Sequence, residues 1–90
     1  QLIPVSTNKS LLDKYFRIYP NPAGSRITVS SPEYAMKGLE IIDMNGKIHL
    51  FEKMDMPSHR VDLDFQLIPG IYLLKIETRE GYFNSRLVVE

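Results

Sequence analysis

Leu67-Ile68-Pro69-Gly70-Ile71-Tyr72-Leu73-Leu74-Lys75-Ile76 is the longest apolar run of the 90-residue chain and its strongest indication of fold class. After its Pro-Gly turn, large apolar side chains fall at successive positions and therefore on both faces of an extended strand. A strand of this kind is usually central in its sheet and covered above and below. We therefore predict a buried middle strand over Gly70–Thr78.

Shorter segments with alternating apolar and polar residues occupy much of the remaining chain. They are Phe16–Tyr19, Arg26–Ser30, Gly38–Asp43, Ile48–Phe51, Arg60–Asp64 and Tyr82–Val89. Turn-forming residues separate them at intervals of about 8 to 12 residues, a spacing typical of β-sandwiches with antiparallel sheets. The pattern predicts an all-β sandwich of about seven antiparallel strands.

Four connections have recognisable turn or loop chemistry. Asn45-Gly46 predicts a β-hairpin with a type I′ turn, because both residues tolerate positive φ. Pro20-Asn21-Pro22 predicts a rigid bend that exposes its asparagine, since two prolines fix φ and remove two amide donors. Glu80-Gly81 predicts a second tight turn, and Glu52–Ser58, which contains a proline, is expected to be a loop.

Length, charge and cysteine content limit the functional classes. Ninety residues allow one domain, which we place at residues 16–90 after a linker at residues 1–15 that is rich in polar residues and proline. Eleven basic and eleven acidic residues cancel, which argues against a nucleic-acid or membrane-surface binder. The absence of cysteine excludes disulfides, thiolate metal sites and cysteine nucleophiles. Gln1–Val5 lacks the character of a signal peptide, so the export signal of an exported protein is expected to lie upstream or to be of another kind.

Residues that could support metal binding are few and widely spaced. His49 and His59 occur singly, and a zinc site would require them to converge with a carboxylate such as Asp43 or Asp62. Asp62 and Asp64 share one face of a predicted strand, yet the further oxygen ligands of a calcium site are missing. We expect solvent-exposed side chains at these positions rather than a metal site.

Catalytic and ligand-binding motifs are equally weak. No serine lies in a nucleophile elbow, and no glycine-rich phosphate loop is present. Tyr15, Phe16 and Tyr19 could form an aromatic platform for a sugar, although aromatic residues beside a first strand more often belong to the core. The sequence therefore predicts neither an enzyme nor a cofactor.

Four landmarks, taken together and in order, carry a family resemblance. They are Ile18-Tyr19-Pro20-Asn21-Pro22-Ala23, Ile42-Asp43-Met44-Asn45-Gly46-Lys47, the Leu67–Ile76 stretch and Ser85-Arg86-Leu87-Val88-Val89. Over residues 16–90 the chain resembles the type A C-terminal sorting domain of the Bacteroidetes type IX secretion system, also called the Por secretion system. Where the family commonly ends in a basic residue, this chain has Glu90.

The resemblance implies a fold and a function. Such domains are immunoglobulin-like sandwiches that direct a cargo protein, already in the periplasm, through an outer-membrane translocon. In many members a surface sortase removes the domain and joins the cargo to anionic lipopolysaccharide. The implied partners are the translocon and its shuttle components, the sortase and the N-terminal cargo domains of the same polypeptide. The implied location is the cell surface or the medium, with an outer-membrane association and no nucleic acid involved.

The sorting motif is carried over residue by residue from the resemblance. Its positions in this chain are Pro20, Asn21, Pro22, Gly46, Lys47, Gly70, Tyr72, Lys75, Arg86, Leu87, Val88 and Val89. The terminal strand could also offer backbone groups for strand addition to a receptor, with Arg86 placing a charge at its edge.

Two other functions stay open at the level of sequence. One is an immunoglobulin-like carbohydrate-binding or adhesion module of an extracellular protein, which an exposed aromatic cluster or a bound calcium ion would favour. The other is a structural spacer in a surface protein, which unchanged export after deletion of the domain would favour.

Overall fold

The computed structural model describes residues 15–90, so all but the last residue of the predicted linker lies outside the described range. Its secondary structure consists of strands joined by short connections. The strands are β1 Arg17–Tyr19, β2 Arg26–Ser30, β3 Met36–Asp43, β4 Ile48–Ser58, β5 Arg60–Asp64, β6 Gly70–Thr78 and β7 Gly81–Val89. No helix among residues 15–90 has the length and apolar character needed to cross a membrane.

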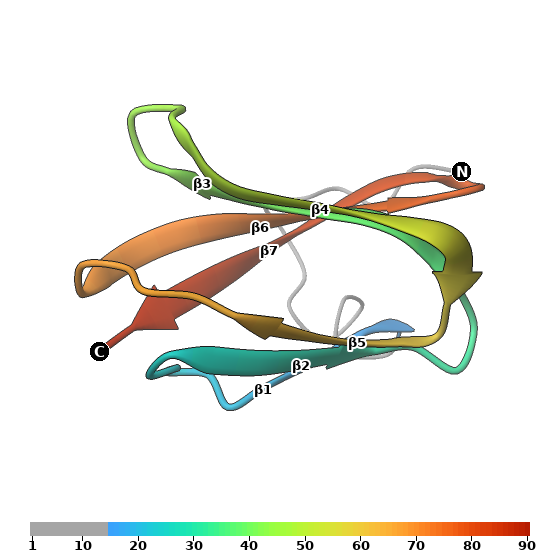
Figure 1. Cartoon of the computed structure of the whole chain (residues 1–90), viewed down its shortest axis with the longest axis horizontal. Helices are drawn as coiled ribbons and strands as arrows, with labels where there is room; N and C mark the ends of the chain where they lie inside the picture. Colours follow the sequence, from blue (N-terminus) through green and yellow to red (C-terminus); the bar gives the residue numbers. More distant parts are fainter. Residues whose placement is uncertain (1–14) are drawn as a thin grey trace.

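The strands form two antiparallel sheets that face each other as layers (Figure 1). The smaller sheet has the order β1-β2-β5, and the larger sheet has the order β4-β3-β6-β7. Two packed antiparallel sheets of this size form a β-sandwich of the immunoglobulin-like class. The predicted fold is confirmed, with β4 joining the sheet of β3 rather than that of β5.

Apolar side chains from both sheets fill the space between the layers. The buried set is Phe16, Ala23, Ile27, Val29, Met36, Leu39, Ile41, Leu63, Phe65, Tyr72, Leu74, Ile76, Leu87 and Val89. In β2, Ile27 and Val29 alternate with more exposed residues, as their period of two predicts. Leu87 and Val89 of β7 belong to the buried set, so the terminal strand contributes to the core as well as to the surface.

The central strand occupies its predicted position, but only one of its faces is fully buried. β6 lies between β3 and β7, with Tyr72, Leu74 and Ile76 directed into the core. Ile71, on the opposite face, is 44% exposed, because a two-layer sandwich has only one interior. Ile68 precedes the strand and is 80% exposed. The prediction of cover on both faces was therefore wrong.

The hairpin between β3 and β4 exists, but its turn type differs from the prediction. Gly46 has φ +90°, whereas no residue other than glycine has positive φ in the described chain. A type I′ turn needs positive φ at both central positions, so it is excluded. The Gly46 N–H donates to the carbonyl of Asp43, and the Asp43 N–H donates to the carbonyl of Lys47. This pattern fits a type I turn followed by a left-handed glycine.

The segment Glu52–Ser58 is part of β4 and not the predicted loop. β4 is the outer strand of its sheet, and proline is tolerated at a sheet edge because its missing N–H can face away from the neighbouring strand. The pairing with β3 shifts between Met36 and Gly38, which accommodates the irregularity. Pro57 was therefore a poor indicator of a loop.

Candidate functional site

Two of the four sequence landmarks, the first residues of the third and the final residues of the fourth lie at one end of the sandwich. This motif end consists of the β1–β2 bend, the β3–β4 hairpin, the β5–β6 connection and the C-terminal end of β7 (Figure 1). Successive strands run in opposite directions, so alternate connections meet at the same end of the fold. Motifs that are far apart in sequence are thereby brought to one surface.

Asn21 connects the first landmark to the last. Its side-chain Nδ2 donates to the carbonyl of Arg86 at 3.0 Å, and the N–H of Val88 donates to its Oδ1 at 3.0 Å. A side-chain amide has the same donor and acceptor as a peptide group, so Asn21 takes the place of a strand residue beside β7. The asparagine is exposed, as predicted, and both polar atoms of its side chain are hydrogen-bonded to β7.

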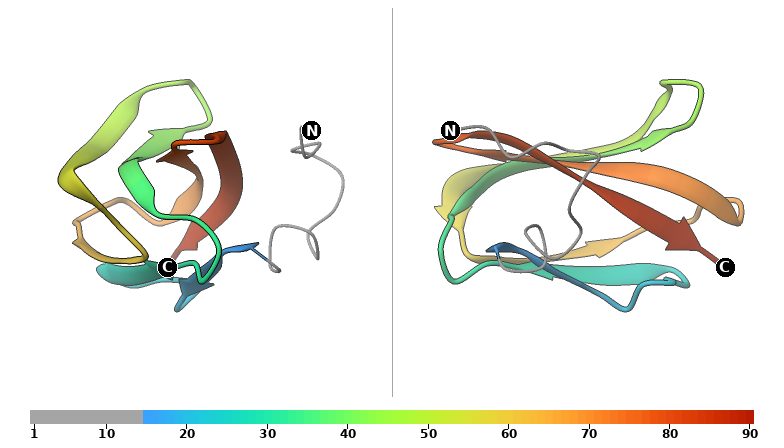
Figure 2. Two further views of the ribbon diagram at one scale, coloured as in Figure 1. Left: turned by 90° about the vertical axis from the view of Figure 1, so that its right-hand side faces the viewer. Right: turned by 180° about the vertical axis from the view of Figure 1, so that it is seen from behind.

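Ala23 continues this contact with its own backbone. Its N–H donates to the carbonyl of Val88 at 2.7 Å, and its carbonyl accepts from the N–H of Glu90 at 2.8 Å. Ala23 and Val89 thus form a parallel bridge, and both side chains are buried. We call Asn21 and Ala23, together with their contacts to β7, the clamp. In the right-hand view of Figure 2, β7 descends at this end toward the smaller sheet, where the clamp holds it.

The flanking prolines suit the clamp because they need no hydrogen-bond partner for an amide. The peptide bonds before Pro20 and Pro22 are both cis, and both proline side chains are exposed. The two prolines leave the side chain of Asn21 to satisfy the backbone of β7. The bend was predicted from the sequence but its partner was not, since a Pro-Asn-Pro motif carries no information about which strand it contacts.

The β3–β4 hairpin is organised by the carboxylate of Asp43. Its Oδ1 accepts from the N–H groups of Asn45 and Lys47, and its Oδ2 accepts from His49 Nε2 at 2.8 Å. The hydrogen bond from His49, followed by that from the Lys47 backbone, lowers the pKa of Asp43 from its ordinary value. Gly46 and Lys47 are exposed at the tip, which presents a charged side chain at the motif end.

Tyr72 links this hairpin to the β5–β6 connection. Its hydroxyl donates to the carbonyl of Ile68, and its ring meets the ring of His49 edge-on with 5.6 Å between centroids. Gly70 opens β6 opposite Val89 and does not have positive φ. A β-carbon at Gly70 would meet its nearest neighbours at 3.9 Å, an ordinary contact. Gly70 is therefore a strand residue rather than an obligatory turn glycine.

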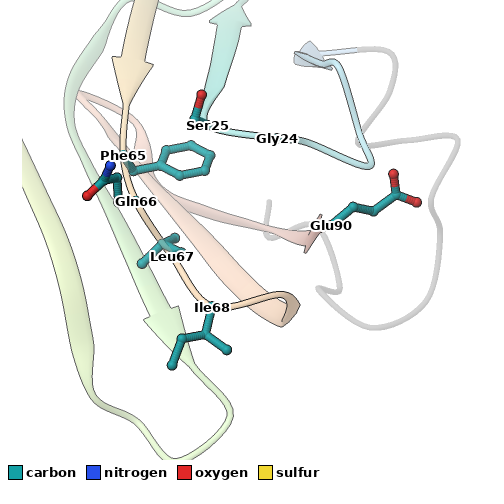
Figure 3. A pocket seen from close by; sticks show the side chains of 7 residues that line it. All are labelled: Gly24, Ser25, Phe65, Gln66, Leu67, Ile68 and Glu90. Atoms are coloured by element: carbon teal, nitrogen blue, oxygen red, sulfur yellow. The ribbon is translucent and has the colours of Figure 1, made fainter.

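An open hollow of about 580 Å³ lies beside the clamp (Figure 3). Its lining residues are Gly24, Ser25, Phe65, Gln66, Leu67, Ile68 and Glu90. Gln66 and Glu90 place polar groups around an otherwise partly apolar floor, and the lining holds no histidine. The hollow provides a contact surface next to the end of β7.

Lys75 is the one motif residue in the middle of a strand, away from the motif end. It lies on the outer face of the larger sheet, 4.0 Å from Glu40 and with its Nζ 4.5 Å from the centroid of the Tyr82 ring. The structure therefore groups the other motif residues of the N-terminal bend, the hairpin and the strand ends, while Lys75 belongs to the sheet surface. Arg86 and Leu87 alternate on β7, with Arg86 exposed and Leu87 fully buried.

Of the candidate metal ligands, His49 and Asp43 contact each other, as one of the predicted pairings had it, and the others form polar contacts with residues outside the set. His59 Nδ1 donates to the carbonyl of Ser31 at 2.8 Å. Asp62 accepts from Thr28 at 2.7 Å, and Asp64 pairs with Arg26 at 2.8 Å across β2 and β5. Within residues 15–90, no three histidine or acidic side chains are close enough to hold a metal ion.

The aromatic residues of the N-terminal segment are mainly internal. Phe16 is 2% exposed and packs against Tyr34 and Phe83, with centroid separations of 5.9 and 4.9 Å. Tyr15 meets Tyr34 edge-on, whereas Tyr19 is 44% exposed. The aromatic cluster connects the chain before β1 to the beginning of β7. Because Phe16 is buried, it cannot be part of an exposed aromatic platform for a sugar.

These features define a class of protein: an immunoglobulin-like β-sandwich module whose terminal strand is clamped at a surface rich in turn motifs. Residues 17–90 match the family described as the secretion system C-terminal sorting domain, and the chain belongs to this family. A search of curated proteins finds no match.

Membership of the family gives the function its general form. The domain is a C-terminal sorting signal for type IX secretion, which interacts with the secretion machinery. A protein that carries it is exported to the cell surface or secreted. The family is not known to be enzymatic.

Proposed function

We propose that the motif end is the surface that the type IX translocon and its shuttle components recognise, and that a surface sortase then removes the domain. In this scheme the cargo is joined to anionic lipopolysaccharide, and the cut falls in the linker before Phe16. The observation that carries the proposal is the clamp, which brings the first and last motifs of the chain into direct contact.

A sorting signal must work on unrelated cargo proteins, so its information has to reside in a module that folds by itself. Residues 15–90 supply their own core and satisfy the end of the terminal strand through Asn21 and Ala23. The relative positions of the motifs are therefore fixed by this domain and do not depend on the cargo.

Exposed cations at or near the motif end suit a recognition surface. Lys47 projects from the hairpin tip, and Arg86 projects from β7 at the clamp. Exposed charges of this kind steer association and select partners more than they stabilise the fold. Reversing both charges should therefore impair recognition without unfolding the domain.

An export assay tests this proposal. Residues 1–90 are fused behind a signal peptide and a fluorescent carrier protein in a Bacteroidetes host that has a working type IX translocon. The test variant combines Lys47→Glu with Arg86→Glu, and the matched control combines Lys53→Glu with Arg79→Glu. The control changes net charge equally and alters exposed residues, with Arg79 in the turn at the opposite end of the fold.

We expect the test variant to accumulate in the periplasm and the control to reach the surface. Carrier at the surface should be smaller by the mass of the domain and should migrate as a lipopolysaccharide-linked series. Equal export of both variants would refute recognition at the motif end. Export of the intact fusion without lipopolysaccharide would refute removal and attachment while leaving recognition in place.

A further inference from the structure

β7 is an edge strand with β6 as its one neighbour in the sheet. The N–H and C=O groups that point away from β6, here called the outer groups, belong to alternate residues of β7. Thr78 faces Gly81 across the two-residue turn Arg79-Glu80, so this pair exchanges both of its backbone hydrogen bonds. Hydrogen-bonded and non-hydrogen-bonded pairs alternate along an antiparallel ladder. Odd-numbered residues of β7 therefore direct N–H and C=O toward β6, and even-numbered residues direct them outward.

The clamp satisfies the outer groups only at the C-terminal end of the strand. Asn21 binds the carbonyl of Arg86 and the N–H of Val88, and Ala23 binds the carbonyl of Val88. These contacts agree with the alternation, because both β7 residues are even-numbered. The sequence suggested the terminal strand as a whole for strand addition, and its C-terminal end is already paired within the chain.

The N-terminal half of β7 retains outer groups that no residue of 15–90 binds. These are the N–H and C=O of Tyr82 and Asn84 and the N–H of Arg86. Asn84 also has a buried side-chain Oδ1 without a hydrogen-bond partner. Most buried polar atoms in proteins are hydrogen-bonded, so an unpaired acceptor beside an open edge indicates a donor from elsewhere.

We propose that Tyr82–Arg86 is the docking strand of this domain, and that an extended peptide segment of a secretion-machinery component adds to it as a further strand. The inference rests on the proposed function and specifies where and how the partner binds. Regularly spaced backbone donors and acceptors select an extended peptide, because such a segment can satisfy them all.

Side chains around the docking strand define the chemistry of that peptide. Tyr82 is 59% exposed and carries Lys75 above its ring. Arg86 is exposed and forms no ion pair with any residue in the described range. A peptide that fits this edge has an acidic side chain facing Arg86 and an apolar side chain against Tyr82.

The clamp gives the docking strand a fixed length. Strand addition is blocked from Val88 onward because Asn21 and Ala23 occupy those groups, so a partner can pair only along the N-terminal half. This arrangement also protects the C-terminal part of β7 from unspecific edge pairing, a hazard for any open strand.

Proline substitution tests the role of the outer amides directly. The Asn84 N–H points away from β6, so Asn84→Pro removes an outer donor and keeps all hydrogen bonds between β6 and β7. Asn84→Ala is the matched control, because it removes the same side chain and keeps the N–H. Both are measured in the export assay, with thermal unfolding to establish that each variant is folded.

We expect surface export of Asn84→Pro to fall about tenfold below that of Asn84→Ala, because both variants lose the contact to Oδ1 and only the proline also removes the outer N–H. Normal export of folded Asn84→Pro would overturn the docking strand while leaving the sorting function intact. An equal loss in both variants would also overturn it. If Asn84→Pro does not fold, Tyr82→Pro against Tyr82→Ala gives the same comparison.

Failure of the wild-type fusion to be exported would instead defeat the proposed function, and this inference with it.

Amide hydrogen exchange of the full chain gives an independent test. We expect the amides of Tyr82 and Asn84 to exchange much faster than that of Leu87, which faces β6. Exchange as slow as that of Leu87 would show that the edge is already occupied within the chain and would contradict docking there.

Discussion

Removal of the Asn21 side chain tests how strongly the clamp holds the terminal strand. Asn21→Ala removes two hydrogen bonds to the backbone of β7, each 3.0 Å long and at an exposed position. A hydrogen bond of this type contributes roughly 0.5–1.5 kcal/mol, and water can replace part of it because the site is exposed. We therefore expect a loss of about 1 kcal/mol in the free energy of unfolding.

For a domain of this size, a loss of about 1 kcal/mol lowers Tm by roughly 4–8 °C, which circular dichroism resolves easily. Hydrogen exchange locates the change: the amide of Val88, which donates to Asn21, should exchange faster in the variant. Asn45→Ala is the control, because its side chain is exposed at the hairpin tip and only its backbone N–H is bonded.

A wild-type Tm in Asn21→Ala, together with unchanged exchange of the Val88 amide, would show that the clamp does not hold β7. A variant that lost stability without any change at Val88 would show that Asn21 acts through the bend alone. In that case the first and last motifs would be neighbours without being coupled.

Three further predictions concern the turn, the core and acid stability. Gly46→Val should cost about 1–2 kcal/mol because φ is +90°, whereas Gly24→Val should cost far less, since a β-carbon there meets nothing within 4 Å; thermal unfolding compares them. Leu74→Ala, at a fully buried position, should cost about 2–5 kcal/mol, and Ile68→Ala, at an exposed one, less than about 0.5 kcal/mol by urea unfolding. Because the pKa of Asp43 is lower in the folded than in the unfolded state, its ionised carboxylate stabilises the fold at pH values above the unfolded-state pKa. This contribution is lost as pH falls through the folded-state pKa, so the Tm of Asp43→Asn should lie below that of wild type near pH 6 and approach it near pH 2.

The structure also changes how the terminal strand should be probed. Truncation of Arg86–Glu90 is an obvious test of the export signal, but Leu87 and Val89 belong to the buried core. The truncated chain would lose core packing together with any recognition surface, so failed export would not separate the two causes. Substitutions at Arg86 or Asn84, whose side chains lie on the outer face, keep the core and address recognition alone.

Sequence patterns predicted the strands well where alternation was clear. Arg26–Ser30 and Arg60–Asp64 were placed with their observed ends, because each alternates apolar and polar residues between turn formers. β4 was predicted too short, since Pro57 is read as a breaker unless the strand is known to lie at a sheet edge. The type I′ turn was wrong because Asn45 tolerates positive φ without requiring it.

The candidate site was only half predictable. The residues of the motifs could be found because their types suit turns and strand ends. The contact between the first and last motifs could not be predicted, because it depends on tertiary structure. Nothing in Pro20-Asn21-Pro22 specifies that its amide pairs with a strand 65 positions away. The odd–even division of β7 likewise follows from the register of one hairpin, which composition cannot determine.

The sorting function is tested most simply by export of the wild-type fusion in two hosts, one with a working type IX translocon and one without. Residues 1–90 follow a signal peptide and a fluorescent carrier, and the location of the carrier is measured by fractionation. We expect the carrier at the surface or in the medium of the competent host only. Carrier confined to the periplasm of both hosts would contradict a sorting function for this chain.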